Sequence, residues 1–151
     1  MIIAFFGHSD FLGNDEYEHK ILTFLERTAA DSPTDIYFGE YGRFDSFAYE
    51  CCKKYKTSHP NVSLILITPY ITLDYQEKQL KHLRCKYDDI IYPDIESKPL
   101  RFAISYRNKW MVEKADHIIF AVHRTFGGAY KAYCYAQKKK KPITNIIGSS
   151  I

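Results

Sequence analysis

The sequence has 151 residues, 46% hydrophobic and 26% charged, a balance that excludes an intrinsically disordered chain. The formal net charge of +3 is small, and the one basic run, Lys138 to Lys141, ends a predicted helix, where cations complement the helix dipole. We therefore expect no nucleic-acid partner. The length predicts a single domain over residues 1–151.

The amino-terminal apolar run ends at Gly7, too early for a signal peptide or a membrane span. The four cysteines form no C-x-x-C pair, so we predict neither a metal site nor a disulfide framework. The sequence thus predicts a cytoplasmic protein with reduced thiols, no membrane partner and no cofactor. The cysteines are Cys51, Cys52, Cys85 and Cys134.

Strands and helices are predicted to alternate along the chain. The expected strands are Ile2 to Phe6, Asp35 to Phe38, Val62 to Thr68, His117 to Val122 and Ile143 to Ile147, with Ile90 to Tyr92 either a minor strand or an extended arm. The expected helices are about Asp15 to Ala30 capped by Asn14, Phe44 to Lys56, Asp74 to Arg84, Leu100 to Lys114, and a helix from the Gly127-Gly128 turn to about Lys140. The segment from Asp74 to Tyr92 fits either a lid over a pocket or a long connection.

Such alternation predicts parallel strands joined by right-handed crossovers. We therefore expect a Rossmann-like, three-layer α/β/α fold with a mostly parallel sheet of about five strands in the order 3-2-1-4-5. In this fold the ligand crevice lies beyond the carboxyl ends of the strands, between the first and the fourth strand.

Polar or glycine-rich loops follow the predicted strands and supply the candidate ligand-binding residues. Glycine amides at helix starts favour anions, and arginine adds charge-assisted bonds to phosphate. Acidic and histidine side chains are candidates for reading a sugar or base, and exposed aromatic rings for stacking on it. The candidates are Gly7, His8, Ser9 and Asp10; Gly39, Glu40, Tyr41, Gly42, Arg43 and Asp45; Arg107; and His123, Phe126, Gly127 and Gly128.

Two of these residues have open alternatives. Asp45 stands in the first turn of a predicted helix, where it either caps the helix or accepts a ribose hydroxyl. Arg107 lies among apolar residues of the predicted helix from Leu100, where an unpaired charge is costly. Its anionic partner is either a carboxylate of the protein or a bound phosphate.

These motifs resemble the SLOG superfamily, which includes the LOG-type phosphoribohydrolases, and most closely its short bacterial branch. The resemblance covers essentially the whole chain and implies the same fold and a nucleotide-derived ligand. It leaves open an enzyme or a sensor, because the superfamily contains both. The matching segments are Phe5 to His8, Gly39 to Asp45, Pro99 to Met111, Ala115-Asp116 and Gly127-Gly128.

The chain departs from the LOG-type catalytic pattern in its last motif. That pattern has a glutamate where this sequence has Cys134, and Arg107-Asn108 stands in place of its basic pair. Cleaving an N-glycosidic bond needs a carboxylate, which Glu40, Asp45 or Asp10 would have to supply.

We therefore expect a domain that senses or sequesters a nucleotide or a nucleotide-derived ligand. The alternative is an N-glycosidase of phosphoribohydrolase type, acting on a nucleoside monophosphate or a related N-glycoside with Glu40 or Asp45 as its catalytic carboxylate. The tyrosines Tyr130, Tyr133 and Tyr135 on the last predicted helix also predict a subunit contact and hence a homo-oligomer.

Overall fold

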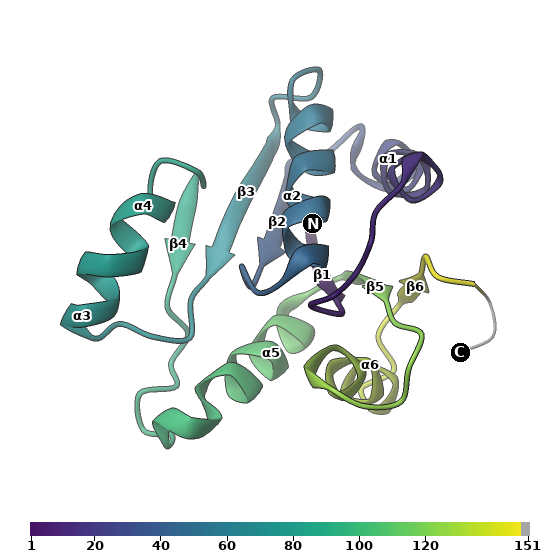
Figure 1. Cartoon of the computed structure of the whole chain (residues 1–151). Coiled ribbons are helices and arrows are strands. Elements are labelled where there is room, and N and C mark those ends of the chain that lie inside the picture. The colour runs from purple at the N-terminus through teal and green to yellow at the C-terminus, as the bar shows by residue number, and fades with distance from the viewer. Residues whose placement is uncertain (149–151) are drawn as a thin grey trace.

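Six parallel strands form one sheet in the computed structural model, which describes residues 1–148 (Figure 1). The order across the sheet is β4-β3-β2-β1-β5-β6, and every neighbouring pair is parallel. The strands are β1 (Ile2–Gly7), β2 (Thr34–Phe38), β3 (Val62–Ile67), β4 (Asp89–Ile91), β5 (His117–Ala121) and β6 (Ile143–Asn145).

The Rossmann-like fold class is confirmed, and so is the predicted order of the five main strands. The sixth strand is β4, the segment predicted as either a minor strand or an arm. It pairs with β3 through Ile65 and Asp89 and extends the sheet at one edge. Its three residues are partly or fully exposed, which explains why the apolar signal of the segment is weak.

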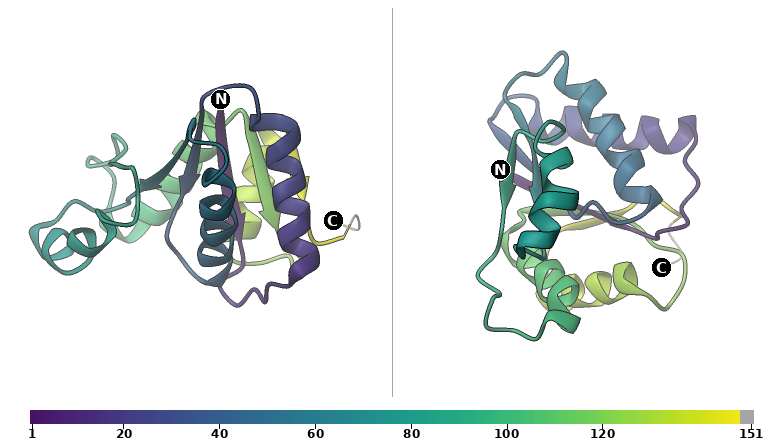
Figure 2. Two further views of the ribbon diagram at one scale, coloured as in Figure 1. Left: turned by 90° about the horizontal axis from the view of Figure 1, so that it is seen from above. Right: turned by 60° about the vertical axis from the view of Figure 1, so that its left-hand side comes forward.

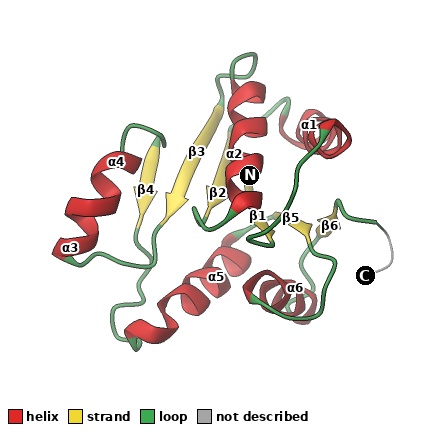
Figure 3. Ribbon diagram, in the orientation of Figure 1, coloured by secondary structure: helices red, strands yellow, loops and turns green. Residues whose placement is uncertain are grey.

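Helices cover both faces of the sheet (Figure 3). Helices α1 (Asp15–Ala29) and α2 (Arg43–Lys56) pack together on one face, and α5 (Ala103–Lys114) and α6 (Gly128–Lys138) pack together on the other. A single 3₁₀ turn, Leu100–Phe102, leads into α5. Asn14 caps α1 as predicted, since its Oδ1 accepts a hydrogen bond of 2.9 Å from the amide of Tyr17.

Two apolar clusters lie on the two faces of the sheet. Successive side chains of a strand point to opposite faces, so Phe5 stacks on Phe38 under α1 and α2 while Phe6 stacks on Phe120 under α5 and α6. Burial on both faces explains why β1 reads as an unbroken apolar run.

The segment after β3 is helical but irregular. Helix α3 (Leu73–Tyr75) continues through a π-helical turn, Gln76–Leu80, into α4 (Lys81–Leu83). It lies beside β4 at one edge of the molecule (Figure 2), with Leu80 buried in the first apolar cluster. In this structure the segment connects β3 to the edge strand and lies outside the lining of the cavity described below.

The basic run and the tyrosines of α6 both have contacts within the chain. The ammonium of Lys141 donates hydrogen bonds to the carbonyls of Glu113 and Ala115 at the end of α5, at 2.9 and 3.1 Å. Tyr133 is buried and packs edge-on against Phe120. This tyrosine is therefore a core residue, which removes part of the basis for predicting a subunit contact. Within residues 1–148, no helix combines the length and apolar character that a membrane span requires.

Candidate functional site

A cavity of about 230 Å³ lies where the carboxyl ends of β1, β2 and β5 meet α5 and α6. This is the crevice predicted from the strand order. Nine of the predicted binding residues line it: Gly7, His8, Ser9, Gly39, Tyr41, Asp45, Arg107, Gly127 and Gly128. The lining also contains Phe5, Phe6, Ile104, Asn108, Arg124 and Ala129. Six other candidates lie outside the lining, namely Asp10, Glu40, Gly42, Arg43, His123 and Phe126.

His8 is a buried, neutral side chain in the wall of the cavity. Burial lowers the pKa of its imidazole, and the nearby Arg124 and His123 lower it further. Its Nε2 accepts a hydrogen bond of 3.3 Å from the amide of His123, so the proton of the neutral ring lies on Nδ1. The two rings meet edge to face at 4.9 Å, and His123 thereby supports His8 from outside the cavity.

Asp45 is a buried carboxyl group in the first turn of α2. Burial raises its pKa to about 7, against the opposing effects of a hydrogen bond from the Tyr41 amide at 2.8 Å and of the charge of Arg107. Its oxygen accepts a hydrogen bond from the loop before α2, and the helix itself has no side-chain cap within the described chain. Because it also lines the cavity, Asp45 can exchange a proton there near neutral pH.

Arg107 lies beneath the cavity and is held by protein acceptors. Its Nη1 donates to the carbonyls of Gly39 and Ile67, at 3.0 and 2.9 Å, and its Nε donates to the Oδ1 of Asn108 at 2.8 Å. These acceptors are neutral groups of the protein, so within this structure Nη1 and Nε pair with neither of the two anions expected, a carboxylate of the protein or a bound phosphate. A side chain at Gly39 would approach the guanidinium to 3.0 Å, so the glycine makes room for Arg107.

Glu40, predicted as a ligand-binding and candidate catalytic residue, lies outside the cavity lining. Its carboxylate pairs with the ammonium of Lys86 at 2.9 Å and accepts a hydrogen bond from the hydroxyl of Tyr87. Both partners lie between α4 and β4, far along the chain from Glu40. Asp45 thus remains as the candidate carboxylate in the cavity lining.

Gly42 and Arg43, predicted to form an anion site at the start of α2, lie outside the cavity lining. Gly42 has a φ of 88°, and a side chain there would approach the Cα of Ser9 to 2.5 Å. The amide of Arg43 donates to the carbonyl of Ser9 at 3.0 Å, while the Arg43 side chain is exposed and outside the cavity lining. The glycine therefore allows two loops to pack closely, and the amides of Tyr41 and Arg43 on either side of it already have protein acceptors.

The start of α6 is open to the cavity. Gly127 has a φ of 94°, and added side chains at Gly127 and Gly128 would meet no described atom within 4 Å. Within residues 1–148, no side chain caps this helix, and its first turn contains no acidic residue. Uncapped amides at the positive end of a helix bind anions.

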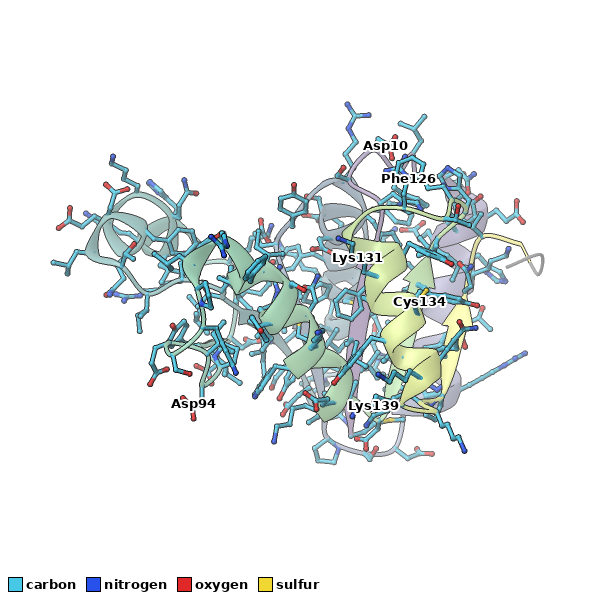
Figure 4. All side chains as sticks on the ribbon, turned by 90° about the horizontal axis from the view of Figure 1, so that it is seen from below. Asp10, Asp94, Phe126, Lys131, Cys134 and Lys139 are labelled. Atoms are coloured by element: carbon cyan, nitrogen blue, oxygen red, sulfur yellow. The ribbon has the colours of Figure 1, made fainter. Side chains whose placement is uncertain are left out.

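Arg124 places a second positive group in the same wall, a residue that sequence reasoning did not single out. Its Nη1 forms an ion pair of 2.9 Å with Asp10, and its Nε is buried without an acceptor among the described residues. Its guanidinium also lies 4.8 Å from the ring centre of the exposed Phe126. Asp10 and Phe126 lie together at one end of the molecule, at the opposite end of α6 from Lys139 (Figure 4). They orient Arg124 and do not line the cavity themselves.

Two further observations concern catalysis and metals. Cys134 lies on an exposed part of α6, outside the cavity lining, so the position that holds glutamate in the LOG-type pattern does not face the cavity (Figure 4). Across residues 1–148, no three His, Cys, Asp or Glu side chains gather closely enough to hold a metal ion.

Comparison with known proteins shows the fold. No family model and no curated protein matches the sequence. DNA processing protein A from Helicobacter pylori, for which a mode of single-stranded DNA binding is described, superposes with a TM-score of 0.58 and 18% identity over 95% of this chain and 63% of that one. DNA processing protein A from Streptococcus pneumoniae superposes with a TM-score of 0.63 and 14% identity, over 99% of this chain and 51% of that one. The structural genomics target TM1055 superposes with a TM-score of 0.57 and 12% identity, over 94% of this chain and 71% of that one. This chain has their fold. It spans about half to two thirds of the length of the two DNA processing proteins.

These structures overturn the exclusion of a nucleic-acid partner. The exclusion rested on the small net charge and on assigning the run Lys138 to Lys141 to a helix end. Lys141 bonds the end of α5 rather than that of the helix that the run follows, α6, and the same fold occurs in a protein that binds single-stranded DNA. Net charge therefore does not decide whether this fold takes a nucleic acid, since binding depends on where the charges lie.

Proposed function

We propose that the protein binds a nucleotide or a nucleotide-derived ligand by its phosphate in this cavity, as a sensing or sequestering domain. The observation that carries the proposal is the uncapped start of α6 beside the guanidinium of Arg124. The helix start supplies amide donors with a partial positive charge, and Arg124 adds a full charge with an Nε that has no acceptor among the described residues. The buried charge of Arg107 makes the potential of the cavity still more favourable to an anion.

The remaining lining supports a proposal for the sugar and the base of the ligand. Complete ligand pockets have volumes of about 300 Å³ or more, so a cavity of about 230 Å³ encloses a phosphate and a sugar rather than a whole nucleotide. Asp45 and the neutral His8 are placed to meet sugar hydroxyls. The ring of Tyr41, which is 61% exposed, lies at the rim and offers a face to the base.

A ligand panel tests the proposal. Thermal unfolding is recorded with mononucleotides, cyclic nucleotides and ADP-ribose derivatives, and each mixture is then chromatographed. A ligand at about one hundred times its dissociation constant stabilises the protein by about 2.7 kcal/mol, and we expect this shift with the ligand recovered intact.

Arg124→Gln is expected to weaken binding at least about tenfold, because a charge-assisted bond to phosphate is lost. Arg27→Gln in the last turn of α1 is the matched control and leaves the shift unchanged. Absence of a shift with every compound would refute the proposal.

A second candidate function is hydrolysis of an N-glycosidic bond, favoured by Asp45. A carboxyl group with a pKa of about 7 at the edge of a cavity can donate a proton to a leaving base at neutral pH. Release of free base by the wild type, with loss of activity in Asp45→Asn and with the rate falling above about pH 7, would establish the enzyme. Intact ligand in every chromatogram would exclude it for the compounds used.

A further inference from the structure

A groove of about 530 Å³ runs between α5 and α6 and adjoins the cavity. Ile104, Asn108 and Gly128 line both spaces, so the groove and the cavity adjoin at these three residues. The first of these residues is apolar and the second offers an amide, which gives the junction both packing and hydrogen-bonding groups.

The charged residues of this groove are all cations. Arg101 and Lys109 come from the α5 side and Lys131 from α6, and the lining contains no acidic residue. Among the described residues, none of the three takes part in an ion pair. Figure 4 shows Lys131 one helical turn before Cys134, on the part of α6 nearer the crevice end. Three uncompensated cations on two neighbouring helices favour an anionic ligand.

Aromatic rings lie beside the same cations. The guanidinium of Arg101 is 4.8 Å from the ring centre of Phe102, which is 45% exposed, and the ammonium of Lys109 is 5.5 Å from that of Tyr135. A bare polyphosphate needs only cations, whereas cations interleaved with exposed aromatic faces are the pattern that binds phosphates and stacked bases together. The groove thus fits a nucleotide unit better than a phosphate chain.

From the adjoining cavity and groove, and from the cations and rings of the groove, we propose that the ligand is a phosphodiester-linked chain of at least two nucleotides. This rests on the proposed function: one unit occupies the cavity with its phosphate at the start of α6. The linking phosphate passes Asn108 and Gly128, and the next unit lies in the groove, with its phosphate near Lys131 and Lys109 and its base beside Phe102 or Tyr135. A free dinucleotide and the end of a single strand share this chemistry, and the length of the probe distinguishes them.

Binding titrations with probes of increasing length test this inference. Mononucleotides of the four bases are compared with the matching 5′-phosphorylated dinucleotides and single-stranded hexanucleotides. We expect the dinucleotide to bind about tenfold more tightly than the mononucleotide, because a second stacked base contributes. The affinity of the dinucleotide should also fall more steeply with salt, since more phosphates are neutralised.

Variants separate the groove from the cavity. Lys131→Gln is expected to lower the affinity for the dinucleotide about fivefold, because an exposed ion pair contributes modestly. The affinity for the mononucleotide should be unchanged. Lys138→Gln at the far end of α6 is the control and should change neither affinity. A hexanucleotide that binds more tightly than the dinucleotide identifies a longer strand as the ligand, and equal affinity identifies a dinucleotide.

Equal affinity for mononucleotide and dinucleotide, with both insensitive to Lys131→Gln, would overturn the inference while leaving the proposed function standing. If no probe binds, the proposed function and the inference fail together. Thermal unfolding of each variant without ligand checks that the fold is intact.

Discussion

Two glycine-rich helix starts in this molecule are alike in sequence and different in structure. The loop with Gly39 and Gly42 leads into α2, and the loop with Gly127 and Gly128 leads into α6. Gly42 and Gly127 both have positive φ, and within the described chain neither helix start has a side-chain cap. Around Gly42 the backbone of Ser9 fills the space of a side chain, whereas around Gly127 and Gly128 that space is empty.

The difference shows that glycine at a helix start has two separate roles. Before α2 it allows close packing, and the amides of Tyr41 and Arg43 already donate to Asp45 and Ser9. Before α6 it leaves amides facing a cavity. The first loop therefore has a structural role and the second is the proposed anion site, and each loop can be tested separately.

The largest expected effect concerns Asp45, the carboxyl group that holds the first loop. Its pKa is raised from 3.8 to about 7, so its contribution to stability is complete below about pH 4 and is lost as the pH rises to about 7. The loss is on the order of 4 kcal/mol. Denaturant unfolding of the wild type and of Asp45→Asn between pH 4 and 8 measures it.

The difference in the free energy of unfolding between the wild type and Asp45→Asn isolates the contribution of Asp45. Burial lowers the pKa of His8, which makes the fold less stable as the pH falls and acts in the opposite direction in the same window. That contribution is common to both proteins and cancels. Parallel stability curves for wild type and Asp45→Asn would contradict the assignment.

The next largest effect is expected for Gly42→Ala. The new Cβ would lie 2.5 Å from the Cα of Ser9, at a φ of 88° that L-residues rarely adopt. We expect a loss of about 3 kcal/mol in the free energy of unfolding, from strain and from displacement of the loops. Equilibrium denaturation checks this value, and a loss below about 0.5 kcal/mol, typical of a neutral surface change, would show that the two loops do not pack as described.

The smallest effect is expected for the same substitution in the other loop. Gly128→Ala meets no described atom within 4 Å, and alanine restricts the unfolded chain more than glycine does. We expect a gain of about 0.5 to 1 kcal/mol in the free energy of unfolding. A loss as large as that of Gly42→Ala would remove the distinction between the two loops.

The fold and the position of the cavity follow from local sequence features. Apolar runs such as Ile2–Gly7, alternation with helices and the crossover rule together predict the strand order, and the strand order predicts the crevice. The SLOG resemblance predicts this fold as well, and membership of that superfamily stays a prediction, because the structural neighbours share no more than 18% identity.

The orientation of individual side chains could not be predicted from local sequence features. Glu40 turns toward Lys86 and Tyr87, which are more than forty positions away in the chain, and no local pattern encodes that encounter. Arg107 finds the carbonyls of Gly39 and Ile67 through the packing of α5 on the sheet. Arg124 stood in a candidate loop, but its importance depends on its distance from Asp10. Such partners become visible only when the tertiary structure is known.

The central claim is that the start of α6 binds the phosphate, and Gly128→Asp tests it most directly. An aspartate in the first turn of a helix stabilises the helix by about 0.3 to 1 kcal/mol and meets no described atom there, so the fold is preserved. Its negative charge occupies the position of the phosphate. Gly128→Asn is the uncharged control of nearly the same shape. We expect a nucleotide that raises the melting temperature of the wild type and of Gly128→Asn to have no effect on that of Gly128→Asp. An equal shift in all three proteins would contradict it.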